Sequence, residues 1–118
     1  MNSWGYHFIG NYSNANLEKI SDKENIIKFV KELVDRIDMV AYGEPQVVHF
    51  GSGNKLGYTL VQLIETSSIT CHFVEENCTF YIDIFSCLPF EQAIAEDVIY
   101  EFFNTRTYNG TFLKRQAA

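Results

Sequence analysis

The sequence predicts an α+β fold, a two-layer sandwich in which an antiparallel sheet carries two main helices on one face. Three observations lead to this prediction. Apolar residues recur at helical spacing in two segments, whereas the other apolar segments are short, rich in β-branched and aromatic residues, and bounded by turn residues. The segments follow the order strand, helix, several strands, helix, strand. The short connections between strands favour antiparallel pairing, with both helices on one face.

The first helix has the clearest signature in the chain, and a strand over Gly5–Tyr12 precedes it. Residues 21–24 (SDKE) form a capping-box pattern, in which Ser21 caps the helix and Glu24 reaches back to it. We therefore expect an amphipathic helix over Asp22–Ile37. Its apolar residues at helical spacing are Ile26, Ile27, Val30, Leu33, Val34 and Ile37.

The middle of the chain predicts four strands, and its last third predicts a helix and a final strand. A glycine-rich loop over residues 51–57 follows the first of the four, and a tight turn over residues 75–78 precedes the last. The second helix begins near Pro89, because proline fits the first helical turn. A last strand is expected over Tyr108–Leu113. The four middle strands are Gln46–Phe50, Tyr58–Glu65, Ser68–Val74 and Thr79–Phe85.

Length and charge limit the classes of function. With 118 residues we expect one domain over 1–118. The formal net charge is −6 and the nine basic residues are scattered, which argues against a nucleic-acid partner. The N-terminus has no secretory pattern. No run approaches the ~18 apolar residues of a membrane span, so we expect no membrane association.

The cysteines and histidines argue against disulfides and metal. Cys71, Cys78 and Cys87 are odd in number and form no CxxC pair, which favours reduced thiols in a cytoplasmic protein. The three histidines are dispersed along the chain, with no paired ligand spacing. We therefore expect no metal site.

The last two of the four middle strands place chemically useful side chains on one face of a hairpin. With the turn centred on residues 76–77, His72 lies opposite Tyr81 and Cys87 lies opposite the Thr66–Ser67 peptide. We expect a thiol, an imidazole, a carboxylate and several hydroxyls to converge at the end of this hairpin. The same composition also fits a half-exposed sheet face without a catalytic role. The side chains sharing the face are Ser68, Thr70, His72, Tyr81, Asp83 and Cys87.

The spacing of three residues resembles the processing segment of the prokaryotic-type S-adenosylmethionine decarboxylases. In that family a serine is followed five positions later by a histidine, and fifteen positions after that by a cysteine; Ser67, His72 and Cys87 have this spacing. Residues 83–87 (DIFSC) resemble the family's acidic-aliphatic-Phe-hydroxyl-Cys ending. Residues 5–8 (GYHF) resemble its early Gly-x-His strand. The resemblance covers essentially the whole chain.

The resemblance implies a proenzyme that cuts itself between Thr66 and Ser67. The Ser67 hydroxyl would attack the preceding carbonyl, leaving a β chain of residues 1–66 and an α chain of residues 67–118. Ser67 would become an N-terminal pyruvoyl group, the cofactor, which forms a Schiff base with the substrate amine. The implied activity is that of a carbon–carbon lyase that decarboxylates S-adenosylmethionine for spermidine biosynthesis.

The resemblance also assigns roles to single residues. His72 would transfer protons during processing, assisted by the hydroxyl of Thr59, eight positions before the processed serine. Cys87 would be the proton donor in decarboxylation. Phe50 would stack on adenine, and Glu76 would hold the ribose hydroxyls. Phe50 also fits as a core residue without this role, and Glu76 also fits as an exposed turn residue. A homo-oligomer, a dimer of processed protomers, is implied as well.

Two departures from the family pattern leave alternatives open. Thr66 stands where the family typically has glutamate, and Val74-Glu75 replaces its Trp-Pro. Because Thr66 and Ser68 flank Ser67, the cleavage position is ambiguous by one residue. One alternative is the same pyruvoyl machinery acting on another amino acid, such as arginine or ornithine. The other is an unprocessed, non-catalytic binding or regulatory homologue.

Overall fold

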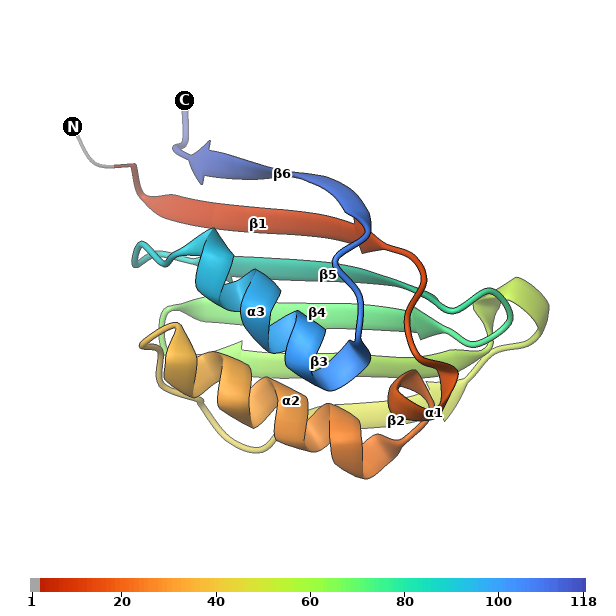
Figure 1. Cartoon of the computed structure of the whole chain (residues 1–118). Helices are drawn as coiled ribbons and strands as arrows, with labels where there is room; N and C mark the ends of the chain where they lie inside the picture. Colours follow the sequence, from red (N-terminus) through yellow and green to blue (C-terminus); the bar gives the residue numbers. More distant parts are fainter. Residues whose placement is uncertain (1–2) are drawn as a thin grey trace.

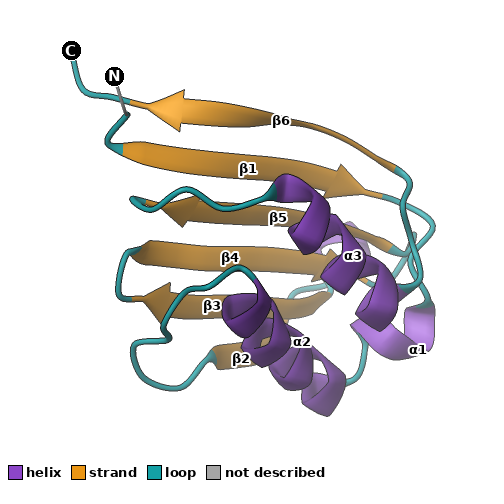
Figure 2. Cartoon of the chain, turned by 60° about the vertical axis from the view of Figure 1, so that its left-hand side comes forward, coloured by secondary structure: helices purple, strands orange, loops and turns teal. Residues whose placement is uncertain are grey.

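In the computed structural model, which describes residues 3–118, six strands form one antiparallel sheet in the order β2-β3-β4-β5-β1-β6. Three helices cover one face of this sheet (Figures 1 and 2), as the predicted two-layer α+β sandwich requires. The strands are β1 (Gly5–Tyr12), β2 (Gln46–Phe50), β3 (Gly57–Ile64), β4 (Ser67–Val74), β5 (Thr79–Ser86) and β6 (Tyr108–Arg115). The helices are α1 (Leu17–Ile20), α2 (Lys23–Arg36) and α3 (Gln92–Phe103), with a 3₁₀ turn η1 (Gly53–Lys55).

Strand boundaries differ from the predicted ones at β6, which continues two residues past Leu113 to Arg115, and at the β3–β4 hairpin. Both strands begin one residue earlier than predicted, and β3 ends at Ile64. Only Glu65 and Thr66 therefore join the two strands, and Ile64 pairs directly with Ser67. The peptide bond between Thr66 and Ser67 consequently lies where a tight turn enters β4.

The start of α2 corrects the predicted cap. The Asp22 carboxylate, rather than the Ser21 hydroxyl, accepts hydrogen bonds from the backbone N–H groups of Glu24 (3.0 Å) and Asn25 (3.3 Å). Ser21 instead ends the preceding helix α1, and its hydroxyl donates to the carbonyl of Leu17. α1 spans only four residues, too few to show a helical period, so the sequence did not reveal that Ser21 was already in use.

The hydrophobic core lies between the helices and the sheet. The ring of Phe103 in α3 lies 4.6 Å from that of Phe29 in α2, 5.1 Å from Phe73 in β4 and 5.2 Å from Phe80 in β5, measured between centroids. These contacts join both helices to the centre of the sheet. They fix which face of each strand is covered, because side chains alternate between the two faces.

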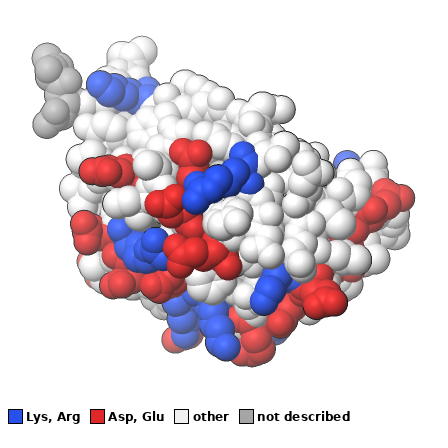
Figure 3. Space-filling view, viewed as in Figure 1, with Lys and Arg blue, Asp and Glu red and all other residues white. Residues whose placement is uncertain are grey.

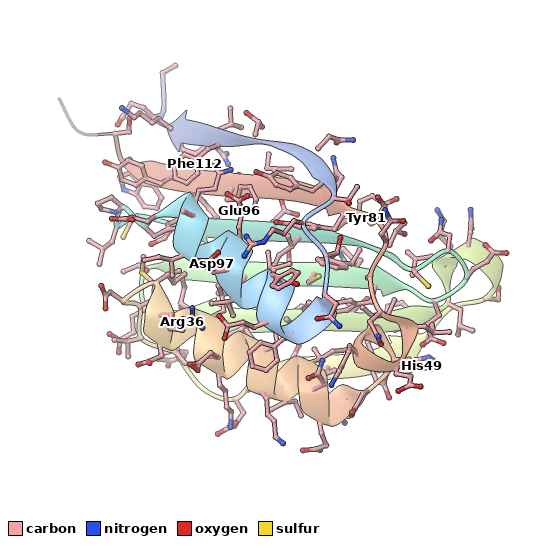
Figure 4. The ribbon with its side chains drawn as sticks, in the orientation of Figure 1. Arg36, His49, Tyr81, Glu96, Asp97 and Phe112 are labelled. Carbon is pink, nitrogen blue, oxygen red and sulfur yellow. The ribbon has the colours of Figure 1, made fainter. Side chains whose placement is uncertain are left out.

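The opposite face of the sheet, called here the open face, is not covered by any element among residues 3–118. It carries exposed apolar side chains, among them Phe50 (56% exposed), Leu63 (52%) and Tyr81 (45%). Tyr81, labelled in Figure 4, belongs to this face near one end of β5. Exposed apolar side chains gathered on one face are typical of a surface that another molecule covers.

On the helix side, acidic and basic side chains are interspersed (Figure 3). The Arg36 guanidinium in α2 lies 2.7 Å from the Glu101 carboxylate in α3. The Arg106 guanidinium lies 3.0 Å from Asp97. Arg36 and Asp97 are labelled on the two helices in Figure 4. Within residues 3–118, no helix is long and apolar enough to cross a membrane.

Candidate active site

The register of the β4–β5 hairpin is the one predicted. Ser67 pairs with Ser86, and His72 pairs with Tyr81. The other residues of β4 and β5 pair in the same register to the ends of the strands. Cys87 directly follows β5, so it lies opposite Thr66, one step beyond the last pair. The structure therefore confirms which side chains share each face of this hairpin.

At one end of the hairpin, the predicted cleavage site is held by backbone contacts. The N–H of Cys87 donates a hydrogen bond of 2.9 Å to the carbonyl oxygen of Thr66. That carbonyl belongs to the peptide bond that Ser67 would attack. Thr66, Ser67 and Cys87 are all half-buried. The geometry thus places a backbone donor on the carbonyl of the predicted scissile bond.

At the other end, Thr59 and His72 meet. They are directly opposed residues of β3 and β4, and the Thr59 hydroxyl lies 3.2 Å from Nδ1 of His72. Both side chains belong to the open face, and His72 is exposed to solvent. The hydroxyl and the imidazole to which the family resemblance gives a role in processing are therefore in contact with each other.

The two ends do not converge, which corrects the expectation that all these groups gather at one place. Ser67 and His72 are five residues apart on one extended strand, a separation of about 16 Å at ~3.3 Å per residue. Five is odd, so their side chains also alternate to opposite faces. In Figure 1 the β3–β4 turn and the end of β5 lie at the left of the sheet, away from the end of β4. Sharing a hairpin is not enough to bring residues together along its length.

A pocket of about 480 Å³ opens beside the Thr59–His72 pair. It is lined by aromatic and hydrogen-bonding side chains, including Phe50, Thr59, His72 and Tyr81. The loop after β2 contributes Lys55 to the lining, a residue that sequence reasoning missed. Three of the predicted residues therefore meet at one concave site.

The sequence also carries the pattern of a known protein family over nearly its whole length. A family model described as S-adenosylmethionine decarboxylase matches residues 6–116. The chain belongs to the S-adenosylmethionine decarboxylase family. The enzyme class predicted from the sequence, a carbon–carbon lyase of this type, is thereby confirmed.

A solved structure shares the fold of this family member. The crystal structure of an adenosylmethionine decarboxylase from Aquifex aeolicus VF5 matches with a TM-score of 0.82 and 19% sequence identity. The match covers 100% of this chain and 95% of the other. The six-stranded sheet with its helices on one face is therefore an arrangement found in a solved decarboxylase structure.

The predicted ribose-binding residue of this decarboxylase lies outside the pocket lining. Glu76 is exposed in the β4–β5 turn. The neighbouring Glu75 instead holds His49, whose Nε2 lies 2.7 Å from the carboxylate. His49 is labelled in Figure 4 at the end of the sheet that carries this turn. The role of Glu76 remains a prediction.

A second polar cluster on the open face uses the early Gly-x-His strand. Arg115 Nη1 lies 3.0 Å from Nδ1 of His7, and Nε2 of His7 lies 2.9 Å from Asp83. A guanidinium can only donate, so Nδ1 accepts and Nε2–H donates to Asp83. The Arg115 guanidinium also stacks 4.8 Å from the centroid of Phe85. Sequence reasoning pointed to His7 and Asp83 but missed Arg115, which is distant in the chain.

The three cysteines of the decarboxylase are free and differ in environment. Cys71 is fully buried under the helices, and burial, with a smaller effect from Asp83, raises the pKa of its thiol well above the ordinary value. Cys78 and Cys87 are half-buried. In the described part of the chain, no three His, Cys, Asp or Glu side chains are grouped to hold a metal ion.

Proposed function

We propose that the chain is a proenzyme that cuts itself between Thr66 and Ser67 and then decarboxylates S-adenosylmethionine with a pyruvoyl group derived from Ser67. The observation that carries this proposal is the hydrogen bond from the Cys87 N–H to the Thr66 carbonyl. The product would supply aminopropyl groups for spermidine biosynthesis. The groups that this proposal uses lie at the two ends of the hairpin.

In the cleavage step, the Ser67 hydroxyl oxygen adds to the carbonyl carbon of Thr66. The C–N bond between Thr66 and Ser67 breaks, and its nitrogen takes a proton, so an ester replaces the amide. The negative charge that develops on the carbonyl oxygen is stabilised by the Cys87 N–H, already 2.9 Å away. Loss of the Ser67 α-proton then releases the Thr66 carboxylate, and water displaces the nitrogen as ammonia.

The residues present suit the pyruvoyl group. Ser67 directly follows a two-residue turn, so cleavage there frees an N-terminus at the start of a strand without removing any strand residue. When formed, the group supplies an electron sink for decarboxylation of an amino acid. Cys87 directly follows β5 and lies opposite Thr66 across the hairpin, so its thiol is the one we propose gives the substrate a proton.

From the separation of Ser67 and His72 along β4 we infer that two copies of the chain share each active site. In a two-fold dimer whose open faces pack together, the His72 end of one sheet would lie beside the β3–β4 turn of its partner. The imidazole would then approach the Thr66–Ser67 peptide at the end of the sheet, while the Ser67 side chain alternates to the covered face. The exposed apolar side chains of the open face supply a surface for this contact. Thr59 and His72 of one protomer would then assist cleavage in the other.

The pocket lining favours a nucleoside over a basic amino acid. Phe50 and Tyr81 offer aromatic faces for adenine, and Thr59 offers a hydroxyl. Arginine and ornithine need a carboxylate for their side-chain cation. Among the described residues, the lining holds Lys55 and no carboxylate.

We place the protein in the cytoplasm, where the free thiol of Cys87 would stay reduced.

Intact-mass spectrometry of the purified protein tests the cleavage. We expect two fragments that divide at Thr66–Ser67, the C-terminal one carrying a pyruvoyl group, and an uncut Ser67→Ala control. Release of CO₂ from S-adenosylmethionine, but not from arginine or ornithine, would support the substrate. A wild-type chain that stays at full length after long incubation would overturn the proposal in favour of a binding homologue.

A further inference from the structure

A buried hydroxyl lies directly across the hairpin from the predicted pyruvoyl precursor. Ser86 has no solvent exposure and is the cross-strand partner of Ser67. Its Oγ lies 2.9 Å from the hydroxyl oxygen of Thr66 and 3.4 Å from the sulfur of Met39. The Thr66 hydroxyl lies 3.3 Å from the same sulfur. The residue before the scissile bond therefore has its side chain in a buried polar contact.

The donors and acceptors of this cluster leave few arrangements. The N–H of Leu88 donates a 3.0 Å hydrogen bond to Ser86 Oγ. The thioether of Met39 can only accept. A hydroxyl oxygen is a stronger acceptor than a thioether, so at 2.9 Å one hydroxyl of the Ser86–Thr66 pair donates to the other, and the second donates to sulfur. In both arrangements, the hydrogen bond between the two hydroxyls is made.

Thr66 is thus held at two points by one short segment. Ser86 holds its side chain, and the N–H of the next residue, Cys87, holds its carbonyl oxygen. Two contacts fix the orientation of a peptide plane, whereas one contact allows it to turn. Because attack requires the reacting atoms within about 3.5 Å and aligned, turning of this plane would slow the reaction strongly.

We propose that Ser86 is a positioning residue for self-cleavage, which holds Thr66 so that its carbonyl stays on the Cys87 N–H. The inference rests on the proposed function. Ser86 does not touch the carbonyl itself; it acts through the Thr66 side chain. Thr66, the residue before the predicted scissile bond, supplies the hydroxyl that this arrangement uses.

The test is a double-mutant cycle on the cleavage rate, followed by intact mass during cell-free synthesis. Thr66→Val keeps the shape of the side chain and removes its hydroxyl, and Ser86→Ala removes the partner. We expect each variant to cut about tenfold more slowly than wild type or worse. Thr66→Ser, which keeps the hydroxyl, should cut within about threefold of wild type. The double variant should be no slower than the slower single variant, because both remove one interaction.

A matched control separates positioning from stability. Thr105 carries another buried hydroxyl, bonded to the Ser13 carbonyl and the Thr107 N–H, at the far end of α3. Thr105→Val should lower the melting temperature without changing the cleavage rate. The role of Ser86 would be overturned if Thr66→Val and Ser86→Ala each cut at the wild-type rate. It would also be overturned if the fold-reductions of the two single variants multiplied in the double variant. A wild-type chain that never cuts would instead overturn the proposed function.

Discussion

The backbone N–H of Cys87 donates to the carbonyl oxygen of Thr66 at 2.9 Å, so one residue contacts the predicted scissile bond and also carries the predicted proton donor. The two roles use different atoms of Cys87. The contact to Thr66 comes from the main chain, which every residue except proline provides. Proton donation needs the thiol.

The two roles of Cys87 can therefore be separated by substitution. We expect Cys87→Ser to cut itself within a few-fold of wild type, because the main-chain donor remains. Decarboxylation by the cut variant should fall by about a hundredfold or more, the usual loss when a general acid is removed. Intact mass measures the first quantity and CO₂ release the second. Equal losses in both would show that the thiol itself acts in cleavage.

The cap of α2 gives a second prediction, on stability. Asp22→Ala removes the side chain that accepts from the N–H groups of Glu24 and Asn25, and should lower the free energy of unfolding by about 1 kcal/mol. Ser21→Ala removes only an exposed hydroxyl bonded to a carbonyl, and should cost less than about 0.5 kcal/mol. Urea unfolding of both variants measures the difference. The reverse order would restore Ser21 as the cap.

The fold was predictable because local patterns determine it. The 3.6-residue period in α2 and the β-branched and aromatic segments between glycine-rich turns gave every strand and both main helices within a few residues. The β4–β5 register followed from placing one turn at Glu76–Asn77. α1 was missed because one helical turn has no period. The cap of α2 was less predictable, because it depends on where the preceding helix α1 ends: Ser21 ends α1, so Asp22 caps α2.

The site was only partly predictable, because its contacts join residues distant in the chain. The pairing of Thr59 with His72 and the facing of Cys87 onto Thr66 both follow from strand register. The hairpin pattern alone did not show that these two pairs lie far apart. Their separation follows only from the number of residues between them along β4. Contacts made by the C-terminal strand, such as Arg115 on His7, span most of the sequence and leave no local signal.

The buried thiol gives a third prediction. Burial raises the pKa of Cys71, and its side chain has no solvent exposure, so the thiolate that reacts with alkylating agents is scarce and inaccessible. In the native protein at pH 8 we expect iodoacetamide to modify Cys78 and Cys87 and to spare Cys71. Peptide mass mapping identifies the labelled positions. Rapid labelling of Cys71 without denaturant would contradict the packing of β4 under the helices.

The Tyr12 hydroxyl gives a fourth prediction. In the described chain it is buried without a hydrogen-bond partner, and burial, followed by the nearby charge of Glu96, raises its pKa. The unfolded phenol ionises near pH 10, whereas the native one holds its proton to higher pH, so ionisation favours unfolding above about pH 10. Tyr12→Phe should raise the free energy of unfolding by about 1 kcal/mol at pH 7. It should also weaken the alkaline loss of stability, measured by urea unfolding between pH 7 and 11.

The shared active site gives the last prediction, by complementation between two inactive chains. Ser67→Ala lacks the cleavable serine and His72→Ala lacks the imidazole, so each alone should stay uncut or cut very slowly. When the two are co-expressed, a mixed dimer combines Ser67 of the second chain with His72 of the first. We expect about half of the His72→Ala chains to be cut at equal expression, since half would pair with the other variant. A mass tag on one chain distinguishes them.

The control for complementation replaces the first chain with the double variant Ser67→Ala/His72→Ala, which should restore nothing. Cutting of the His72→Ala chain only in the presence of an intact His72 on another chain requires the two residues to meet across an interface. This result would explain how self-cleavage can need both residues although they lie about 16 Å apart on one strand. If His72→Ala is cut at the wild-type rate on its own, His72 has no part in processing. If no mixture rescues it, the two residues act within one chain, and the strand must rearrange before cleavage.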